Sequence, residues 1–264
     1  MCERVMTRGA IVASLAALTA APAFAQSAPG AEPALIDDIV TANRILADQD
    51  ILDGFGHVSA RSERDPSRFW LSRSRAPGLV VADDVMLFGL DGEPLDARGR
   101  TPYLERFIHS EVYKARPDVK AVVHSHAPAI IPFGVTGVPL RPIFHIASFL
   151  MDAVPIFEIR DAAGPSTDLL VRNAQLGAAL ARSLGAAPVV LMRGHGCTVV
   201  ASSVHEVVFR SIYTVVDAKL ETEALRLGTP KFLTPGEAAA SAKVNAALVD
   251  RPWEIWKAHA LGKS

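Results

Sequence analysis

The chain has 264 residues, of which 50% are hydrophobic and 21% are charged, and its formal net charge is -1. This balance is that of a globular protein with enough apolar side chains for a core, in one large domain or two small ones. The 27 basic and 28 acidic residues are spread along the chain without a basic block, so the composition argues against nucleic-acid binding.

The first 25 residues have the pattern of an export signal. Two arginines precede a short apolar run over residues 9–21, and Ala23 to Ala25 form the small-x-small pattern that signal peptidase reads. The apolar run is too short to span a bilayer. We predict a signal peptide over residues 1–25 and a single domain over residues 26–264, located in a bacterial periplasm or secreted, with no membrane contact after cleavage.

Hydrophobic periodicity predicts a series of helices and strands after the signal. In chain order these are a helix over 34–48, strands over 57–61, 69–72 and 85–90, a helix over 101–115, strands over 120–124 and 154–158, a helix over 168–184, strands over 188–192 and 197–201, and a helix over 203–227. Asp91-Gly92 is typical of a hairpin turn, and Thr101 before Pro102 is typical of a helix start. Together these elements predict an α/β domain with three layers, in which helices flank a mainly antiparallel sheet.

Three histidines stand at the ends of predicted strands. His124 and His126 are two residues apart, so their side chains share one face where a strand ends. His195 lies between two glycines after another strand and could reach the same place. Three imidazoles with an open position are typical of a catalytic divalent metal site. The alternative is that these are three unrelated core or surface histidines.

Glu105 is a further candidate, near the start of the predicted helix over residues 101–115. It shares a helix face with His109, four residues on, and the next strand leads to the histidine pair. A carboxylate beside a metal can act as a fourth ligand or as a general acid or base. In the first turn of a helix it could equally serve only to cap the helix and stabilise its dipole.

Four blocks of the chain, in the same order, resemble the class II aldolase/adducin family. They are Gly56 to Arg61 (Gly-His-Val-Ser-Ala-Arg), Glu105 to His109 (Glu-Arg-Phe-Ile-His), the run from Ala115 to Ala127, and Arg193 to Gly196 (Arg-Gly-His-Gly). The resemblance extends over about residues 36–227. The form of these blocks is nearest to the branch of decarboxylases of hydroxylated pyridine and aromatic carboxylates.

The resemblance implies a divalent metal ion, zinc first, with manganese or another ion as alternatives. Its ligands would be His124, His126 and His195, with Glu105 able both to ligate the ion and to move a proton. It also implies a small-molecule substrate and a homotetramer with active sites between subunits. The apolar stripe of the helix over 203–227 could serve such an interface as well as the core, or the core alone.

The substrate-binding segments differ from those of phosphosugar members of the family. His57 replaces an asparagine, and Tyr103 and Leu104 replace a pair of serines. Arg73 and Arg75 lie in the segment that holds a phosphate in those members. Because guanidinium groups pair well with carboxylates, we expect Arg73 and Arg75 to contact a carboxylated substrate. His57 could contact the substrate or carry a proton. The alternatives are a structural role for His57 and a solvated loop for the arginines.

These features predict a divalent-metal-dependent carbon–carbon lyase that stabilises an enolate-like intermediate. The first hypothesis is decarboxylation of a hydroxylated aromatic or heteroaromatic carboxylate. The second is an aldehyde-lyase, an aldolase acting on a sugar-like or hydroxy-carbonyl substrate, and the third is a non-catalytic adducin-like module. Intact histidines argue against the third hypothesis, and release of carbon dioxide or of an aldehyde distinguishes the other two.

Overall fold

The computed structural model describes Met1 and residues 32–262, so the predicted signal peptide and its cleavage site lie outside the described residues. Glu32 begins a single compact unit that contains all the helices and strands described below. Within this part of the chain, no helix combines the length and the apolar character needed to cross a membrane.

Seven strands form one sheet in the order β3-β2-β1-β4-β7-β6-β5. Every neighbouring pair is antiparallel except β5 and β6, which run parallel. The predicted mainly antiparallel sheet is therefore confirmed. The strands are β1 (His57–Arg61), β2 (Arg68–Ser72), β3 (Val85–Gly89), β4 (Ala121–Ser125), β5 (Ile156–Phe157), β6 (Val189–Met192) and β7 (Gly196–Ala201).

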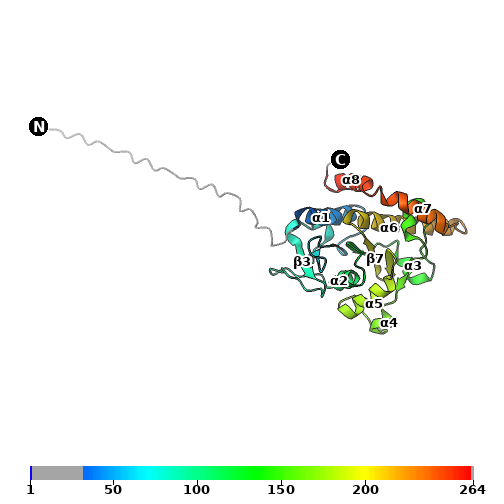
Figure 1. The fold of residues 1–264 in the computed structure, drawn as a ribbon, viewed down its shortest axis with the longest axis horizontal. Helices are drawn as coiled ribbons and strands as arrows, with labels where there is room; N and C mark the ends of the chain where they lie inside the picture. Colours follow the sequence, from blue (N-terminus) through cyan, green and yellow to red (C-terminus); the bar gives the residue numbers. More distant parts are fainter. Residues whose placement is uncertain (2–31, 263–264) are drawn as a thin grey trace. The chain divides into compact units, whose positions relative to one another are not determined.

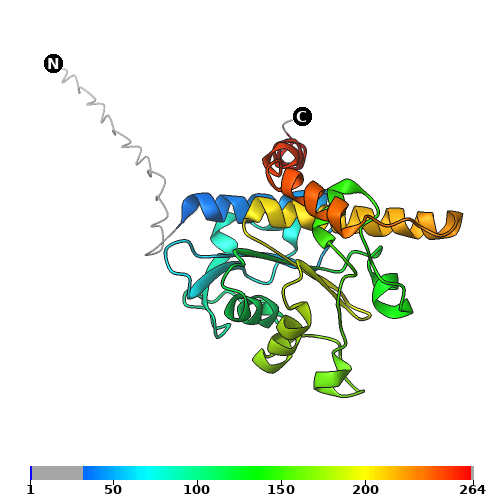
Figure 2. The ribbon, with the colours of Figure 1, turned by 45° about the vertical axis from the view of Figure 1, so that its right-hand side comes forward.

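Helices cover both faces of this sheet (Figures 1 and 2). On one face α1, α6 and α8 pack against one another, and on the other face α2 packs against α5. The three-layer α/β prediction is confirmed. The helices are α1 (Pro33–Asp48), α2 (Arg106–Ala115), α3 (Ile131–Thr136), α4 (Arg160–Ala163), α5 (Ala174–Leu184), α6 (Val204–Leu227), α7 (Pro235–Ala246) and α8 (Asp250–Ala260), with short 3-10 turns η1 (Pro77–Leu79), η2 (Ala82–Asp84) and η3 (His145–Leu150).

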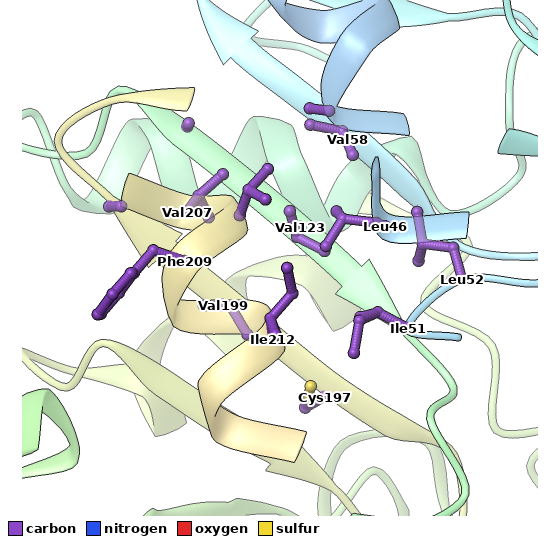
Figure 3. Packing of buried hydrophobic residues seen from close by; sticks show 14 of the residues in the cluster. Leu46, Ile51, Leu52, Val58, Val123, Cys197, Val199, Val207, Phe209 and Ile212 are labelled. Carbon is purple, nitrogen blue, oxygen red and sulfur yellow. The ribbon is translucent and has the colours of Figure 1, made fainter. Parts of the chain in front are cut away.

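Alternating side chains of the central strands supply two separate cores. Val58, Val123 and Val199 belong to the cluster that packs under α6 and α1 (Figure 3). Val122 and Val200, their neighbours in the chain, belong to the cluster on the α2 and α5 side. Because successive strand residues point to opposite faces, strands covered on both faces read as continuous apolar runs. Each such valine contributes about 1.5–3 kcal/mol by burial.

The predicted helix over residues 101–115 begins later than expected, at Arg106. Pro102 instead forms an antiparallel bridge with Arg73, and the Thr101 carbonyl accepts a hydrogen bond from the Ser74 amide at 2.8 Å. The prediction that Thr101 caps this helix was wrong, because the segment pairs with the continuation of β2. This extended segment carries Tyr103 and leads directly to Glu105.

The predicted helix over residues 168–184 also begins later, at Ala174, where the Asn173 side chain accepts a hydrogen bond from the Leu176 amide. The segment before it contains Leu169, whose φ of 68° lies in the left-handed region. The predicted strand over 154–158 shortens to β5, and the turn after β3 is present, where Gly92 adopts a φ of 84°. Two helices after residue 227, α7 and α8, were not predicted.

Candidate metal centre

Three imidazoles meet where β4 ends and where β6 turns into β7. The Nε2 atom of His126 lies 2.9 Å from the Nε2 atoms of both His124 and His195. The turn that carries His195 depends on its glycines. A side chain at Gly196 would put its Cβ 2.0 Å from the Ser125 carbonyl oxygen, so only glycine lets β7 begin this close to the end of β4.

Hydrogen bonds to the outer nitrogens aim two of these imidazoles inward. His124 Nδ1 lies 3.0 Å from the Cys197 carbonyl oxygen, and His195 Nδ1 lies 2.9 Å from that of Leu169. A carbonyl only accepts, so each Nδ1 carries the hydrogen and each Nε2 presents a lone pair to the cluster. Lone pairs that face one another repel unless a cation lies between them. The donor set therefore fits a divalent ion.

Glu105 completes the cluster. Its Oε2 lies 3.6 Å from His124 Nε2 and 3.5 Å from His195 Nε2, and one ligand atom from each of the four residues lies within 4.8 Å of the others. Its Oε1 accepts a hydrogen bond from the Val171 amide at 2.9 Å. Glu105 occupies the position before α2 but makes no side-chain capping bond, so the capping interpretation does not describe it.

Burial and neighbouring charges set the protonation of these groups. Burial would raise the pKa of Glu105, but hydrogen bonds and charge from His124 and His195 outweigh it and hold that pKa well below its usual range. Burial, followed by the nearby His124 and His195, lowers the pKa of His126 to about 4. Neutral imidazole and ionised carboxylate are the forms that bind zinc and similar ions. Two ligands of a tetrahedral zinc ion stand about 3.3 Å apart, close to the separations here.

A cavity of about 440 Å³ opens directly on this cluster, and Glu105 and His126 form part of its wall. Phe55, Leu104 and Leu170 supply apolar surface. This volume is within the usual range for small-molecule sites, which combine apolar walls with a few polar groups. The cluster and the cavity together form a candidate active site.

The two predicted substrate arginines share one buried carboxylate. Asp84, only 4% exposed, bonds Arg73 Nε at 2.5 Å and Arg75 Nη1 at 2.8 Å. Burial would raise the pKa of Asp84, but the hydrogen bonds, from Arg73 first, outweigh it and lower that pKa. One carboxylate against two guanidinium groups leaves a net positive charge. Arg75 lines the cavity, whereas Arg73 contributes through Asp84.

His57, the remaining predicted substrate contact, is part of the cavity wall and only 3% exposed. Its ring lies 4.5 Å from that of Tyr103 and 5.2 Å from that of His124, measured between centroids. The Tyr103 hydroxyl contacts the Arg75 carbonyl oxygen and so ties the arginine segment to the same wall. The structure therefore brings His57, Arg75 and the four cluster residues together.

The sequence reasoning missed the groups that orient the cluster. The Leu169 carbonyl and the Val171 amide hold His195 and Glu105, and Asp84 holds both arginines. Backbone groups have no signature in residue type, so nothing marked residues 169–171. Asp84 could have been suspected, because it is a carboxylate that follows two closely spaced arginines.

Comparison with known proteins agrees with this geometry. Residues 37–222 match the model of the class II aldolase and adducin N-terminal domain. The chain is 38% identical to decarboxylase tropJ of Talaromyces stipitatus, over 82% of this chain and 90% of that protein. It is 35% identical to the 3,4-dihydroxyphthalate decarboxylase of Arthrobacter keyseri, over 72% of this chain and 78% of that protein.

Solved structures share the fold. An L-fuculose 1-phosphate aldolase from Glaciozyma antarctica superposes with a TM-score of 0.71 at 22% identity, over 87% of this chain and 90% of that one. An aldolase II superfamily protein from Pseudomonas syringae gives a TM-score of 0.71 at 19% identity, over 87% and 94%. The relatives confirm the prediction that the protein is a lyase and that its sequence resembles the decarboxylases of the family. The chain belongs to the class II aldolase and adducin family.

Proposed function

We propose that this protein is a divalent-metal-dependent decarboxylase that removes carbon dioxide from a hydroxylated aromatic carboxylate. The proposal rests on one observation. The cluster of three imidazoles and Glu105 lies next to a cavity whose wall contains a guanidinium group and apolar side chains. The relatives named as decarboxylases, among them three 3,4-dihydroxyphthalate decarboxylases at 30–35% identity, support this reaction and this class of substrate.

In this proposal His124, His126, His195 and Glu105 hold the ion, with zinc favoured by the imidazole donors. A bound divalent ion would supply Lewis-acid stabilisation to the substrate oxygen that takes up negative charge. The hydrogen bonds from Nδ1 of His124 and His195 to backbone carbonyls fix the two rings in their ligating orientation. These two imidazoles are thus oriented before the substrate binds.

Arg75 binds a carboxylate of the substrate. Its guanidinium is held on Asp84, and Arg73 balances the charge of that carboxylate, so the positive charge of Arg75 stays available to an anion. A flat ring fits against the apolar surface of Phe55, Leu104 and Leu170. These contacts orient the substrate and keep water from the carbon that becomes negative.

The reaction breaks the bond between a ring carbon and its carboxylate carbon. Carbon dioxide leaves, and the electron pair remains on the ring and its hydroxyl oxygen. A proton must then be added to the same ring carbon. Glu105, which is ionised before the substrate binds, takes the proton of the substrate's ring hydroxyl on Oε2, the oxygen that faces the imidazoles, and returns it to that ring carbon, while the Val171 amide holds Oε1 in place.

The aldehyde-lyase hypothesis remains the alternative outcome. The cavity has Tyr103 and Leu104 in its wall at the place where the phosphosugar branch has two serines, and it therefore lacks those hydroxyls for a phosphate. Arg75 in the wall favours a carboxylate instead. The structural likeness to L-fuculose 1-phosphate aldolase concerns the fold alone.

The test is a substrate comparison with the purified, zinc- or manganese-loaded protein. Hydroxylated benzene and pyridine carboxylates, 3,4-dihydroxyphthalate among them, are compared with L-fuculose 1-phosphate, and both carbon dioxide and aldehyde are measured. The proposal predicts carbon dioxide from at least one aromatic carboxylate and no aldehyde from the phosphosugar. Aldehyde release without carbon dioxide would establish the aldolase alternative. Loss of turnover after chelation and recovery on adding metal back would support metal dependence.

We further propose that the mature protein is exported and assembles as a homotetramer. The pattern of residues 1–25 supports export. Exposed apolar side chains at the end of α6, Leu220, Leu225 and Leu227, support a contact between copies of the chain. Amino-terminal sequencing of the exported protein tests the first proposal, and light scattering after size-exclusion chromatography tests the second.

A further inference from the structure

A chain of buried hydrogen bonds runs from the candidate active site into the core between β1 and α2. His57 Nδ1 lies 2.6 Å from His109 Nε2, and His109 Nδ1 lies 2.6 Å from Ser59 Oγ. Ser59 Oγ lies 2.8 Å from the Tyr113 hydroxyl, which ends the chain. None of these four residues is more than 3% exposed. Spacings of two on the strand and four on the helix put them on facing surfaces.

The direction of the chain follows from counting its hydrogens. Within the described residues, the buried Tyr113 hydroxyl has Ser59 as its hydrogen-bond partner, so Tyr113 donates to Ser59. The single hydroxyl hydrogen of Ser59 then goes to its other partner, His109 Nδ1. Nδ1 of His109 therefore accepts.

The same count continues through the two imidazoles. Both rings are buried, and burial without a charged partner disfavours the doubly protonated form. A neutral His109 that accepts at Nδ1 carries its hydrogen on Nε2 and donates it to His57 Nδ1. A neutral His57 must then carry its hydrogen on Nε2, the nitrogen that takes no part in this chain.

The opposite direction leaves a buried donor without an acceptor. If His109 Nδ1 donated to Ser59, then Ser59 would donate to Tyr113, and the Tyr113 hydrogen would have no acceptor among the described residues. An unpaired buried donor costs enough to shift the ratio of the two directions by roughly 5- to 150-fold. Each hydrogen bond in this series is therefore donated in the direction from Tyr113 to His57.

We propose that Tyr113, Ser59 and His109 are positioning residues that hold His57 as the Nε2–H tautomer, so that His57 donates a hydrogen bond to an anionic oxygen of the substrate. A lone pair at that nitrogen would repel a carboxylate, whereas an N–H group in the cavity wall that also contains Arg75 adds a second donor for it. The same tautomer prevents His57 from binding a metal through Nε2, although its ring lies 5.2 Å from that of His124. The role towards the substrate rests on the proposed function, but the tautomer does not.

The tautomer is measured directly by nitrogen NMR of the zinc-loaded full chain labelled with ¹⁵N-histidine. The His57 signals are assigned by their loss in His57→Gln. The proposal predicts a protonated, pyrrole-type Nε2 and an unprotonated, pyridine-type Nδ1. A His57 ring protonated on Nδ1, or on both nitrogens, would overturn it. This result does not depend on which substrate the protein accepts.

Variants at His109 test the consequence for catalysis. His109→Leu removes the donor to His57 Nδ1, and we expect a fall in kcat/KM of roughly 10- to 150-fold, mostly through KM, for one lost hydrogen bond to a charged group. His109→Gln can offer an amide hydrogen to the same nitrogen and should restore part of that loss. His205→Gln, at a histidine that pairs with Asp250 instead, is the matched control and should behave as wild type.

The outcomes of these experiments distinguish a failure of the positioning role from a failure of the proposed decarboxylase function. Equal losses in His109→Leu and His109→Gln, parallel to equal losses in thermal stability, would mean that His109 acts only through folding and would overturn the positioning role. If His109→Leu does not fold, the tautomer measurement on wild type and His109→Gln still decides. If no aromatic carboxylate is decarboxylated, the proposed function fails while the tautomer result stands.

Discussion

Replacing Asp217 with asparagine should change how stability depends on pH. Asp217 lies on α6, is fully buried, and accepts a hydrogen bond from the Ile143 amide at 3.1 Å. One turn later Glu221 accepts one from the Arg141 amide at 2.9 Å, so the two carboxyl groups anchor the segment 141–143. Burial first, and then the charge of Glu221, raise the pKa of Asp217 from 3.8 to about 7.

Asp217 binds its proton more tightly in the folded state than in the unfolded state. The folded state keeps the Asp217 proton up to about pH 7, whereas the unfolded state releases it near pH 4. The stability that the protonated group contributes is therefore complete below pH 4 and is lost as the pH rises through 7. The whole difference is about 4 kcal/mol at most, of which roughly 2.5 kcal/mol falls between pH 5 and 8.

Asparagine keeps the accepting oxygen for the Ile143 amide and cannot ionise. Urea unfolding of Asp217→Asn and wild type at pH 5, 6, 7 and 8 should therefore show the variant gaining roughly 2.5 kcal/mol relative to wild type across the series. Any constant offset, for example from the Oδ2 position that has no partner in the described structure, cancels in this comparison. A difference that stays constant with pH would refute the reasoning.

Three further predictions concern the site. His195→Ala should lower bound zinc and abolish turnover in a folded protein, because one of four ligand groups is lost and Glu105 would have to remain on the ion as its third ligand instead of moving a proton. Metal analysis with circular dichroism checks this. Glu105→Gln should retain most of the metal and lose roughly two to four orders of magnitude in kcat, and full activity would leave Glu105 no role in proton transfer. Arg75→Ala should raise KM for a carboxylated substrate by an amount equivalent to about 1.5–3 kcal/mol, and more than Arg73→Ala does, because only Arg75 lines the cavity.

Much of the architecture could be predicted from local pattern. The strand that carries His124 and the strand that precedes His195 contain uninterrupted apolar runs, and the glycines on both sides of His195 mark the turn from β6 to β7. These features predict that the three histidines meet at one place. The spacing of two between His124 and His126 then placed both imidazoles on one face.

The predictions of secondary structure were wrong where tertiary contacts override the local conformational preference of the sequence. Thr101 and Pro102 have the residue types of a helix start, but the bridge to Arg73 holds them extended. Residues 168–172 have a helical apolar pattern, yet Leu169 and Val171 are used to orient His195 and Glu105. Such departures from local pattern are expected at functional sites.

The hydrogen-bond and ion-pair partners of the polar site residues also could not be predicted from the sequence. Arg73 and Arg75 were predicted to contact a substrate, and the carboxylate that binds both in the structure, Asp84, lies nine residues beyond Arg75. The buried link from His57 to His109 joins residues 52 positions apart. Neither pairing follows from spacing, because each depends on how β1, η2 and α2 pack.

Metal titration tests the central claim most directly. Zinc is added stepwise to the metal-free protein, and carbon dioxide release from 3,4-dihydroxyphthalate or the best substrate of the panel is measured at each step. The account predicts no release without metal and a rate that saturates at one ion per chain, with His126→Ala inactive throughout. Full carbon dioxide release from metal-free protein, or saturation that is unchanged in His126→Ala, would contradict it.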